Sequence, residues 1–196
     1  MANSAKSKGD RFELEAVKVL CALAETWSIP VVSNPQRMLG AGRAEDVGDV
    51  HVFGDVTIQV RAYAMSKLGL ALLSSARDAV RQAANNPAAD FAVGLVPIPR
   101  TKTDGSVRWL AATYQWPTPL GDGLPVFKLV GRLVPWLRDD EGPHGYLPYP
   151  RVSRVGVFAP GNAASSGPVL VAPVEAWLAS YANARGGRAA GVRGVG

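Results

Sequence analysis

The stretch DFAVGLVPIPR, residues 90–100, is the feature that most restricts what this chain can fold into. It is a nearly continuous apolar run, which is typical of a strand covered on both faces of its sheet. A strand of this kind needs packed structure on either side of the sheet. We therefore expect this segment to lie within a sheet that is covered by helices.

Segments with helical and strand periodicity alternate around this run. Apolar residues recur at i, i+3, i+4 spacing in residues 8–27 and 66–86, and a proline follows each segment. Residues 49–53, 56–63 and 107–116 have the patterns of strands. The order of helix, strand, strand, helix, strand and strand predicts an α/β fold with a mixed central sheet flanked by helices.

Proline and glycine become frequent after Trp116, so the pattern is less regular there. Residues 154–160 and 167–173 have the composition of strands, and residues 174–184 have that of a terminal helix. Residues 125–140 are compatible with either a short helix or a strand.

These patterns divide the chain into three parts. We expect a core of residues 1–116, a Pro/Gly-rich C-terminal extension of residues 117–182 packed on it, and a disordered tail of residues 183–196. Residues 184–196 carry three arginines and no acid, so the tail is a candidate for non-specific contacts with nucleic acid.

The charge of the chain favours an anionic partner. The net charge is +5 and the pI is near 9.6, which is typical of proteins that bind nucleic acid. The single cysteine, Cys21, excludes an intramolecular disulfide and a CxxC zinc knuckle. No apolar run approaches the roughly 18 residues that span a bilayer, and the N-terminus is polar where a signal peptide is apolar. We expect a cytoplasmic protein that does not enter a membrane.

Residues 46–61, DVGDVHVFGDVTIQVR, contain the most informative polar residues. Asp49 stands just before one predicted strand, and Gln59 and Arg61 are two apart on the next, so they share one face of that strand. A surface hairpin with polar residues facing water explains this pattern, and so does a site for binding a metal ion.

The register of this hairpin distinguishes the two interpretations. If the loop holds only Gly54 and Asp55, Val50 faces Gln59 and Asp49 points to the opposite side. A three-residue loop or a bulge brings Asp49 opposite Gln59 on a shared face. A metal site requires that extra residue.

A second unusual carboxylate lies on the first predicted helix. On a helical wheel Glu13 falls between Leu20 and Val17, within the apolar sector, whereas Glu15 lies on its outer edge. A carboxylate in a core-facing stripe is costly unless it is paired, either with a cation of the protein in a buried salt bridge or with a divalent metal ion.

The residue types suit phosphodiester hydrolysis. Magnesium prefers oxygen ligands, and it activates water and neutralises the charge that grows on the phosphate. Glu13, Asp49 and Gln59 offer two carboxylates and an amide oxygen. Arg61 offers a cation that can stabilise phosphate charge.

This arrangement resembles the PD-(D/E)xK nuclease superfamily, and within it the Holliday junction resolvases and their bacteriophage relatives. In that layout a helix glutamate precedes an aspartate that opens one strand and an (E/Q)-x-K pair on the next. The resemblance covers residues 6–115, and its matching stretches are KGDRFELEAVKVL, GRAEDVGDVHVFGDVTIQVR, ARDAVRQAA and FAVGLVPIPR.

The resemblance implies a restriction-endonuclease-like fold and a role for each matching residue. Glu13, Asp49 and Gln59 would be ligands of Mg²⁺ or Mn²⁺, and Asp49, Gln59 and Arg61 would form the catalytic group. Gln82 would be the polar residue of the second helix that faces the site.

The implied function is that of a metal-dependent, structure-selective DNA endonuclease that hydrolyses phosphodiesters of branched or junction DNA. A homodimer is implied because two strands of a junction are cut, and the host cytoplasm would be its location if a phage encodes it. The residues expected to contact DNA are Arg43, Lys67, Arg77, Arg81 and Gln82.

Two positions depart from the family pattern. Gln59 stands where the third ligand is usually glutamate, and Arg61 stands where the catalytic residue is lysine. A neutral amide binds a dication more weakly than a carboxylate, and arginine is too basic to release a proton. The alternative is therefore a catalytically degenerate nuclease fold that serves as a DNA-binding or protein-interaction module.

Other polar residues fit a site less well. Asp46 fits a turn residue better than an outer acid of the site, and His51 and His144 each lack a second histidine at ligand spacing. Serine and cysteine nucleophiles lack a credible histidine partner.

Overall fold

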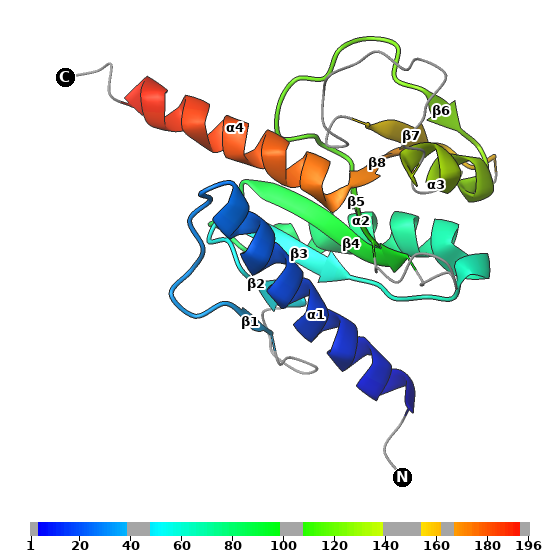
Figure 1. Cartoon of the computed structure of the whole chain (residues 1–196), viewed down its shortest axis with the longest axis horizontal. Coiled ribbons are helices and arrows are strands. Elements are labelled where there is room, and N and C mark those ends of the chain that lie inside the picture. Colours follow the sequence, from blue (N-terminus) through cyan, green and yellow to red (C-terminus); the bar gives the residue numbers. More distant parts are fainter. Residues whose placement is uncertain (1–3, 39–47, 99–107, 139–153, 162–166, 193–196) are drawn as a thin grey trace.

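The computed structural model describes residues 4–38, 48–98, 108–138, 154–161 and 167–192 (Figure 1). Its helices are α1 Ser4–Thr26, α2 Leu68–Ala83, α3 Val130–Arg138 and α4 Val174–Val192, and a 3₁₀ turn, η1 Met65–Lys67, precedes α2. Its strands are β1 Gln36–Arg37, β2 Val50–His51, β3 Val56–Val60, β4 Phe91–Ile98, β5 Arg108–Thr113, β6 Val126–Phe127, β7 Gly156–Phe158 and β8 Val169–Pro173.

Within these residues the fold is mixed α/β, with one eight-stranded sheet in the order β1-β2-β3-β4-β5-β8-β7-β6. β1, β2 and β3 are antiparallel neighbours, and β3 is parallel to β4, which follows it through α2. β4, β5, β8 and β7 are antiparallel in turn, and β6 is parallel to β7. The expected mixed sheet flanked by helices is confirmed.

Helices cover both faces of the sheet. Buried residues of α1 and α4 share one hydrophobic cluster with β2 and β3, whereas those of α2 and α3 share a second cluster with β7 and β8. Figure 1 shows α1 and α4 crossing in front of the strands and α2 behind them. The fully buried residues of β4 confirm that the apolar run at 90–100 marks a strand covered on both faces.

The two faces of β3 differ in character. Val56, Ile58 and Val60 belong to the cluster of α1 and α4. The alternation of side chains along a strand therefore directs Thr57 and Gln59 to the face that α2 covers. All five residues of this strand are buried.

α2 lies very close to β4, and Gly94 makes this possible. A Cβ at residue 94 would come within 2.2 Å of Oγ of Ser75 and 2.5 Å of its backbone carbonyl carbon. Only glycine fits at this distance. The close packing of α2 brings Asp78, about one turn beyond Ser75, to the end of β3, where it contacts Arg61.

The C-terminal residues differ most from the expectation. Residues 117–182 were expected to pack on the core as an extension, but β8 pairs with β5 and continues the same sheet. Residues 125–140 contain both of the alternatives, the strand β6 followed by the helix α3. The strong strand pattern at 167–173 supplies apolar residues such as Val169 and Val171 that are buried only if β8 joins the sheet.

Residues 183–196 were expected to be disordered, whereas α4 continues through Val192 in the part that the structure describes. The arginines and alanines of this segment are strong helix formers, and they extend the helix past the glycines at 186 and 187. No helix among the described residues is long and apolar enough to span a membrane.

Candidate functional site

The hairpin of β2 and β3 has the register that a shared site requires. Val50 pairs with Ile58, not with Gln59, and the backbone N–H of Asp49 donates to the carbonyl oxygen of Ile58 at 2.8 Å. Gly48 enters the strand with φ of 118°, and a Cβ there would lie 2.9 Å from the same oxygen, so glycine is needed.

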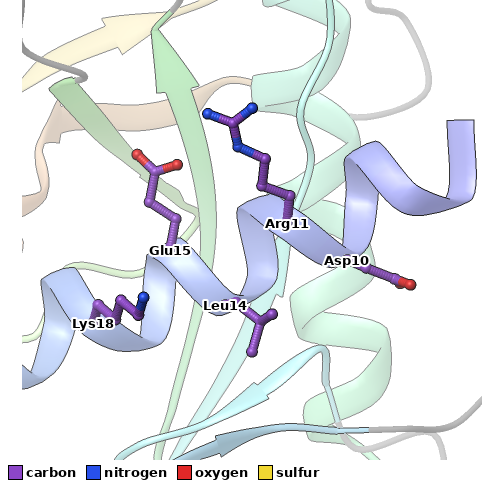
Figure 2. Close-up of a pocket in the computed structure, with 5 residues that line it drawn as sticks. All are labelled: Asp10, Arg11, Leu14, Glu15 and Lys18. Carbon is purple, nitrogen blue, oxygen red and sulfur yellow. The ribbon is translucent and has the colours of Figure 1, made fainter. Parts of the chain in front are cut away.

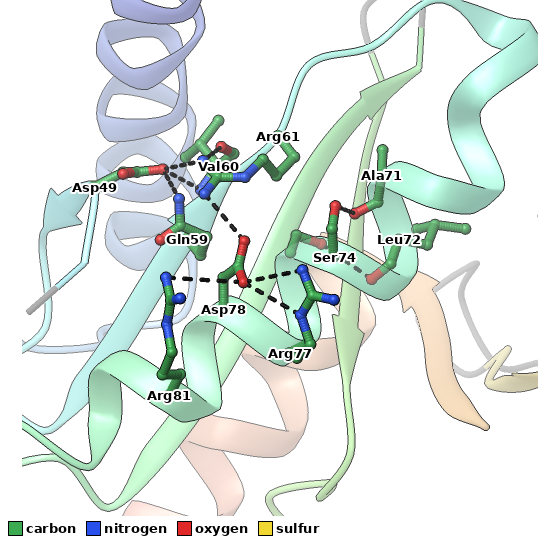
Figure 3. A network of polar contacts seen from close by, with 11 residues as sticks. Asp49, Gln59, Val60, Arg61, Ala71, Leu72, Ser74, Arg77, Asp78 and Arg81 are labelled. Atoms are coloured by element: carbon green, nitrogen blue, oxygen red, sulfur yellow. Dashed lines mark hydrogen bonds and ion pairs between the residues drawn. The ribbon is translucent and has the colours of Figure 1, made fainter. Parts of the chain in front are cut away.

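Asp49 and Gln59 consequently meet on one face of the sheet. Oδ2 of Asp49 accepts hydrogen bonds from Nε2 of Gln59 and from the backbone N–H of Val60, the latter at 2.8 Å (Figure 3). Gln59 is fully buried, and its Oε1 has no hydrogen-bond partner among the described residues. A buried amide oxygen is costly unless a hydrogen-bond donor, a water molecule or a cation contacts it.

Arg61 joins this pair to α2. Its Nη1 lies 3.4 Å from Oδ2 of Asp49, and its Nη2 lies 3.1 Å from Oδ2 of Asp78. Figure 3 shows the Arg61 guanidinium between the two carboxylates. Arg77 and Arg81 approach Oδ1 of Asp78 at 3.4 and 3.9 Å, so three arginines surround this acid.

Glu13 lies near the cluster without bonding to Asp49 in the described contacts. Its Oε2 is 3.6 Å from Nη1 of Arg37, which also pairs with Asp10 at 2.8 Å. Burial and the negative charge of Asp49 raise the pKa of the Glu13 carboxyl, and the charges of Arg37 and Arg61 oppose this effect. Glu13 therefore senses both Asp49 and Arg61, and its direct partner is a cation of the protein.

The other predicted residues are less closely associated. Lys67 is exposed in η1, and Arg77 and Arg81 are exposed on α2 with side-chain accessibilities of 61% and 68%. Gln82 is buried on α2, one turn beyond Asp78. Arg43, like Asp46 and His144, lies outside the described residues.

A surface hollow lies on α1. It is lined by Asp10, Arg11, Leu14, Glu15 and Lys18, all from the same helix. Figure 2 shows the Glu15 and Arg11 side chains on one side of the helix and Leu14 on the other. These side chains spread apart and do not converge on a ligand, so we assign the hollow no role.

The donor set limits what a metal ion could bind. No three His, Cys, Asp or Glu side chains gather as metal ligands in the parts of the chain that the structure describes. The set of Glu13, Asp49 and Gln59 has two carboxylates, and the unpartnered Oε1 of Gln59 is the third oxygen. These oxygen donors are of the kind that a hard cation such as Mg²⁺ or Mn²⁺ accepts together with water.

Asp78, and the contact of Arg37 with Glu13, were not among the features that we expected at the site. Asp78 has a signal in the sequence, because Ser74, Asp78 and Gln82 form a polar stripe at i, i+4 and i+8. All three are buried. A polar stripe on the buried side of a helix indicates a polar site beneath it. Arg37 has no comparable signal, because its contact depends on how β1 meets α1.

Comparison with known protein families, with curated proteins and with solved structures found no match for this chain. The fold and the site define a mixed α/β protein with a partly buried cluster of acids, an amide and arginines at one end of β3.

Proposed function

We propose that the protein is a metal-dependent endonuclease that hydrolyses phosphodiesters of branched DNA, as the resemblance to Holliday junction resolvases implies. The observation that carries the proposal is the meeting of Asp49, Gln59 and Arg61 at one point, which the register of the hairpin makes possible. The order α1, β2, β3, α2, β4 would then correspond to a restriction-endonuclease-like core.

The residues of the cluster would have two different roles, metal binding and stabilisation of phosphate charge. Asp49, Gln59 and Glu13 would hold Mg²⁺ or Mn²⁺, which supplies an activated water and neutralises phosphate charge. Arg61 would stabilise the charge on the phosphate oxygens, because its guanidinium stays protonated and cannot act as a base. Burial and the negative charge of Asp49 raise the pKa of the Glu13 carboxyl, and a dication bound beside the two carboxylates would lower it.

Exposed cations next to the cluster would bind the DNA backbone. Arg77 and Arg81 lie one turn apart on α2, and both reach Asp78 from the solvent side. Contacts of this kind read phosphates and not bases, which gives structure-selective and salt-sensitive binding. A homodimer would supply the two sites needed to cut both strands of a junction.

A second candidate is a degenerate nuclease fold that binds DNA without cutting it. It is favoured by the environment of Asp49, whose Oδ2 already receives Gln59, the Val60 N–H and Arg61. Arginine here provides the positive charge that a metal ion provides in an active nuclease. The two candidates differ in whether a metal ion can compete with Arg61.

Cleavage of a four-way junction tests the proposal. The full chain should cut it with Mg²⁺ or Mn²⁺ and not with EDTA, and Asp49→Asn should abolish cutting while affinity measured in EDTA falls less than about threefold. Asp122→Asn, in an exposed loop, is the control for the change in charge. A wild-type protein that binds junction DNA tightly but stays inert with both metals would support the degenerate nuclease instead.

A further inference from the structure

Asp78 is an acid in a position where an unpaired charge is costly. It lies on the side of α2 that packs against the sheet, and its side chain is only 11% exposed. The neighbouring buried residues on this helix are alanine, serine, leucine and glutamine. A carboxylate at such a position destabilises the fold unless a strong partner compensates.

Arg61 is the partner best placed to compensate it. Arg77 and Arg81 are 61% and 68% exposed, so solvent screens their attraction to Asp78. Arg61 is 30% exposed, and its Nη2 is the nitrogen closest to Asp78, at 3.1 Å. The Arg61–Asp78 pair is therefore the least screened of the three.

We propose that Asp78 is a positioning residue that holds the Arg61 guanidinium beside Asp49 and limits its competition for the Asp49 carboxylate. The two terminal nitrogens of Arg61 reach two different acids, Nη1 to Asp49 and Nη2 to Asp78. The part that concerns a metal ion rests on the proposed function, whereas the pairing itself does not.

The proposal explains why residue 61 is arginine. A guanidinium is a planar fork whose two terminal nitrogens point in different directions, so it can join carboxylates on two elements. A lysine at residue 61 has one ammonium group at the end of a flexible chain, and it does not have this fixed geometry. Arginine at this position is therefore matched to an acid at residue 78.

The same geometry makes Asp78 relevant to metal binding. Arg61 and a dication would compete for Oδ2 of Asp49. Because Arg61 is also paired with Asp78, it interacts less strongly with Asp49, and a dication can displace it more easily. Without Asp78, the attraction of Arg61 to Asp49 has one fewer competitor.

A double-mutant cycle on Mn²⁺ affinity, measured by calorimetry on the full chain without DNA, tests this role. Asp78→Asn should lower the affinity by about three- to tenfold, and Arg61→Gln should raise it. In the Arg61→Gln background, Asp78→Asn should change the affinity by less than about twofold, because Asp78 acts through Arg61. The control is Asp122→Asn, which removes an acid at an exposed residue.

Equal loss of Mn²⁺ affinity in both backgrounds would overturn the proposal, because Asp78 would then act on the ion directly. If the wild-type protein binds no Mn²⁺, the assignment of metal ligands in the proposed function is wrong. Urea unfolding of the wild type, the two single variants and the double variant then tests whether Arg61 and Asp78 are paired. Effects on the unfolding midpoint that are non-additive support the pairing, whereas additive effects overturn it.

Folding of the variants is itself informative. If Asp78→Asn folds only together with Arg61→Gln, the two side chains compensate each other and the pairing is supported. If the double variant fails to fold while Arg61→Gln folds, Asp78 has a structural role that does not involve Arg61, and the proposal is overturned.

Discussion

The hydroxyl of Tyr181 donates a hydrogen bond to Oδ1 of Asp55, although 126 residues separate them in the chain. Asp55 lies in the loop between β2 and β3, and Tyr181 lies on α4. Arg185, one turn later, lies 2.8 Å from the same hydroxyl and 3.4 Å from the same carboxylate. The C-terminal helix thus fixes the loop that sets the register of Asp49 and Gln59.

Tyr181→Phe should destabilise the protein by about 1–2 kcal/mol, because it removes this hydrogen bond and leaves the rings of Trp177 and Phe91 in contact with the new side chain. The loss is measured by urea unfolding at pH 7. Tyr63→Phe, at a residue that is 38% exposed, is the control and should change the stability by less than about 0.5 kcal/mol.

Alkaline pH should narrow the difference in stability between wild type and Tyr181→Phe. Burial, and then the hydrogen bond to Asp55, raise the pKa of Tyr181 above its ordinary value of 10.0. The folded state therefore keeps the proton after the unfolded state loses it, and stability falls as pH rises above that value. Melting temperatures between pH 9 and 11 should fall less steeply for Tyr181→Phe than for wild type. Parallel curves would show that Tyr181 ionises equally in both states.

Gly94→Ala should destabilise the protein by about 1–3 kcal/mol, because the added methyl group would overlap the backbone of Ser75 and push α2 from β4. Gly54→Ala is the matched control, because a Cβ there meets no atom within 4 Å. Chemical denaturation of both variants measures the difference. Equal stabilities would contradict the close approach of α2 to the sheet.

Restoring the nuclease pattern with Gln59→Glu and Arg61→Lys should discriminate between the two proposed functions. In a degenerate nuclease the double change should create metal-dependent cleavage of a four-way junction, because a third carboxylate strengthens metal binding. In an enzyme adapted to its own residues it should lower the rate, because lysine lacks the fork that joins Asp49 to Asp78. Single-turnover cleavage at saturating protein measures the rate.

Binding of branched DNA in EDTA should weaken steeply as the salt concentration rises. The slope of log K against log salt should depend on how many cations of the protein contact phosphates. Arg77→Gln and Arg81→Gln should each reduce the slope of log K against log salt by about one unit. Removing residues 186–196 takes away Arg188 and Arg193, so the slope should fall by up to about two units. An unchanged slope after truncation would show that this segment does not contact DNA.

The sequence alone predicted the central, covered strand, both of the helices that flank the site, and the shared face of Gln59 and Arg61. These features depend on local periodicity, which can be recognised within a short stretch of consecutive residues. The sequence also marked Glu13 as a carboxylate in an apolar stripe, and it left open whether a cation of the protein or a metal ion pairs with it. The structure shows Arg37 as its direct partner.

Only the tertiary structure decided how these parts meet. The pairing of Val50 with Ile58 puts Asp49 beside Gln59, and a shift of one residue would have sent its side chain to the other face. The contact of Arg61 with Asp78 depends on how closely α2 packs on Gly94, and the place of β8 in the sheet depends on its pairing with β5. These contacts join residues far apart in the chain, so local patterns do not determine them; they form because they bury apolar surface and pair charges that are costly alone.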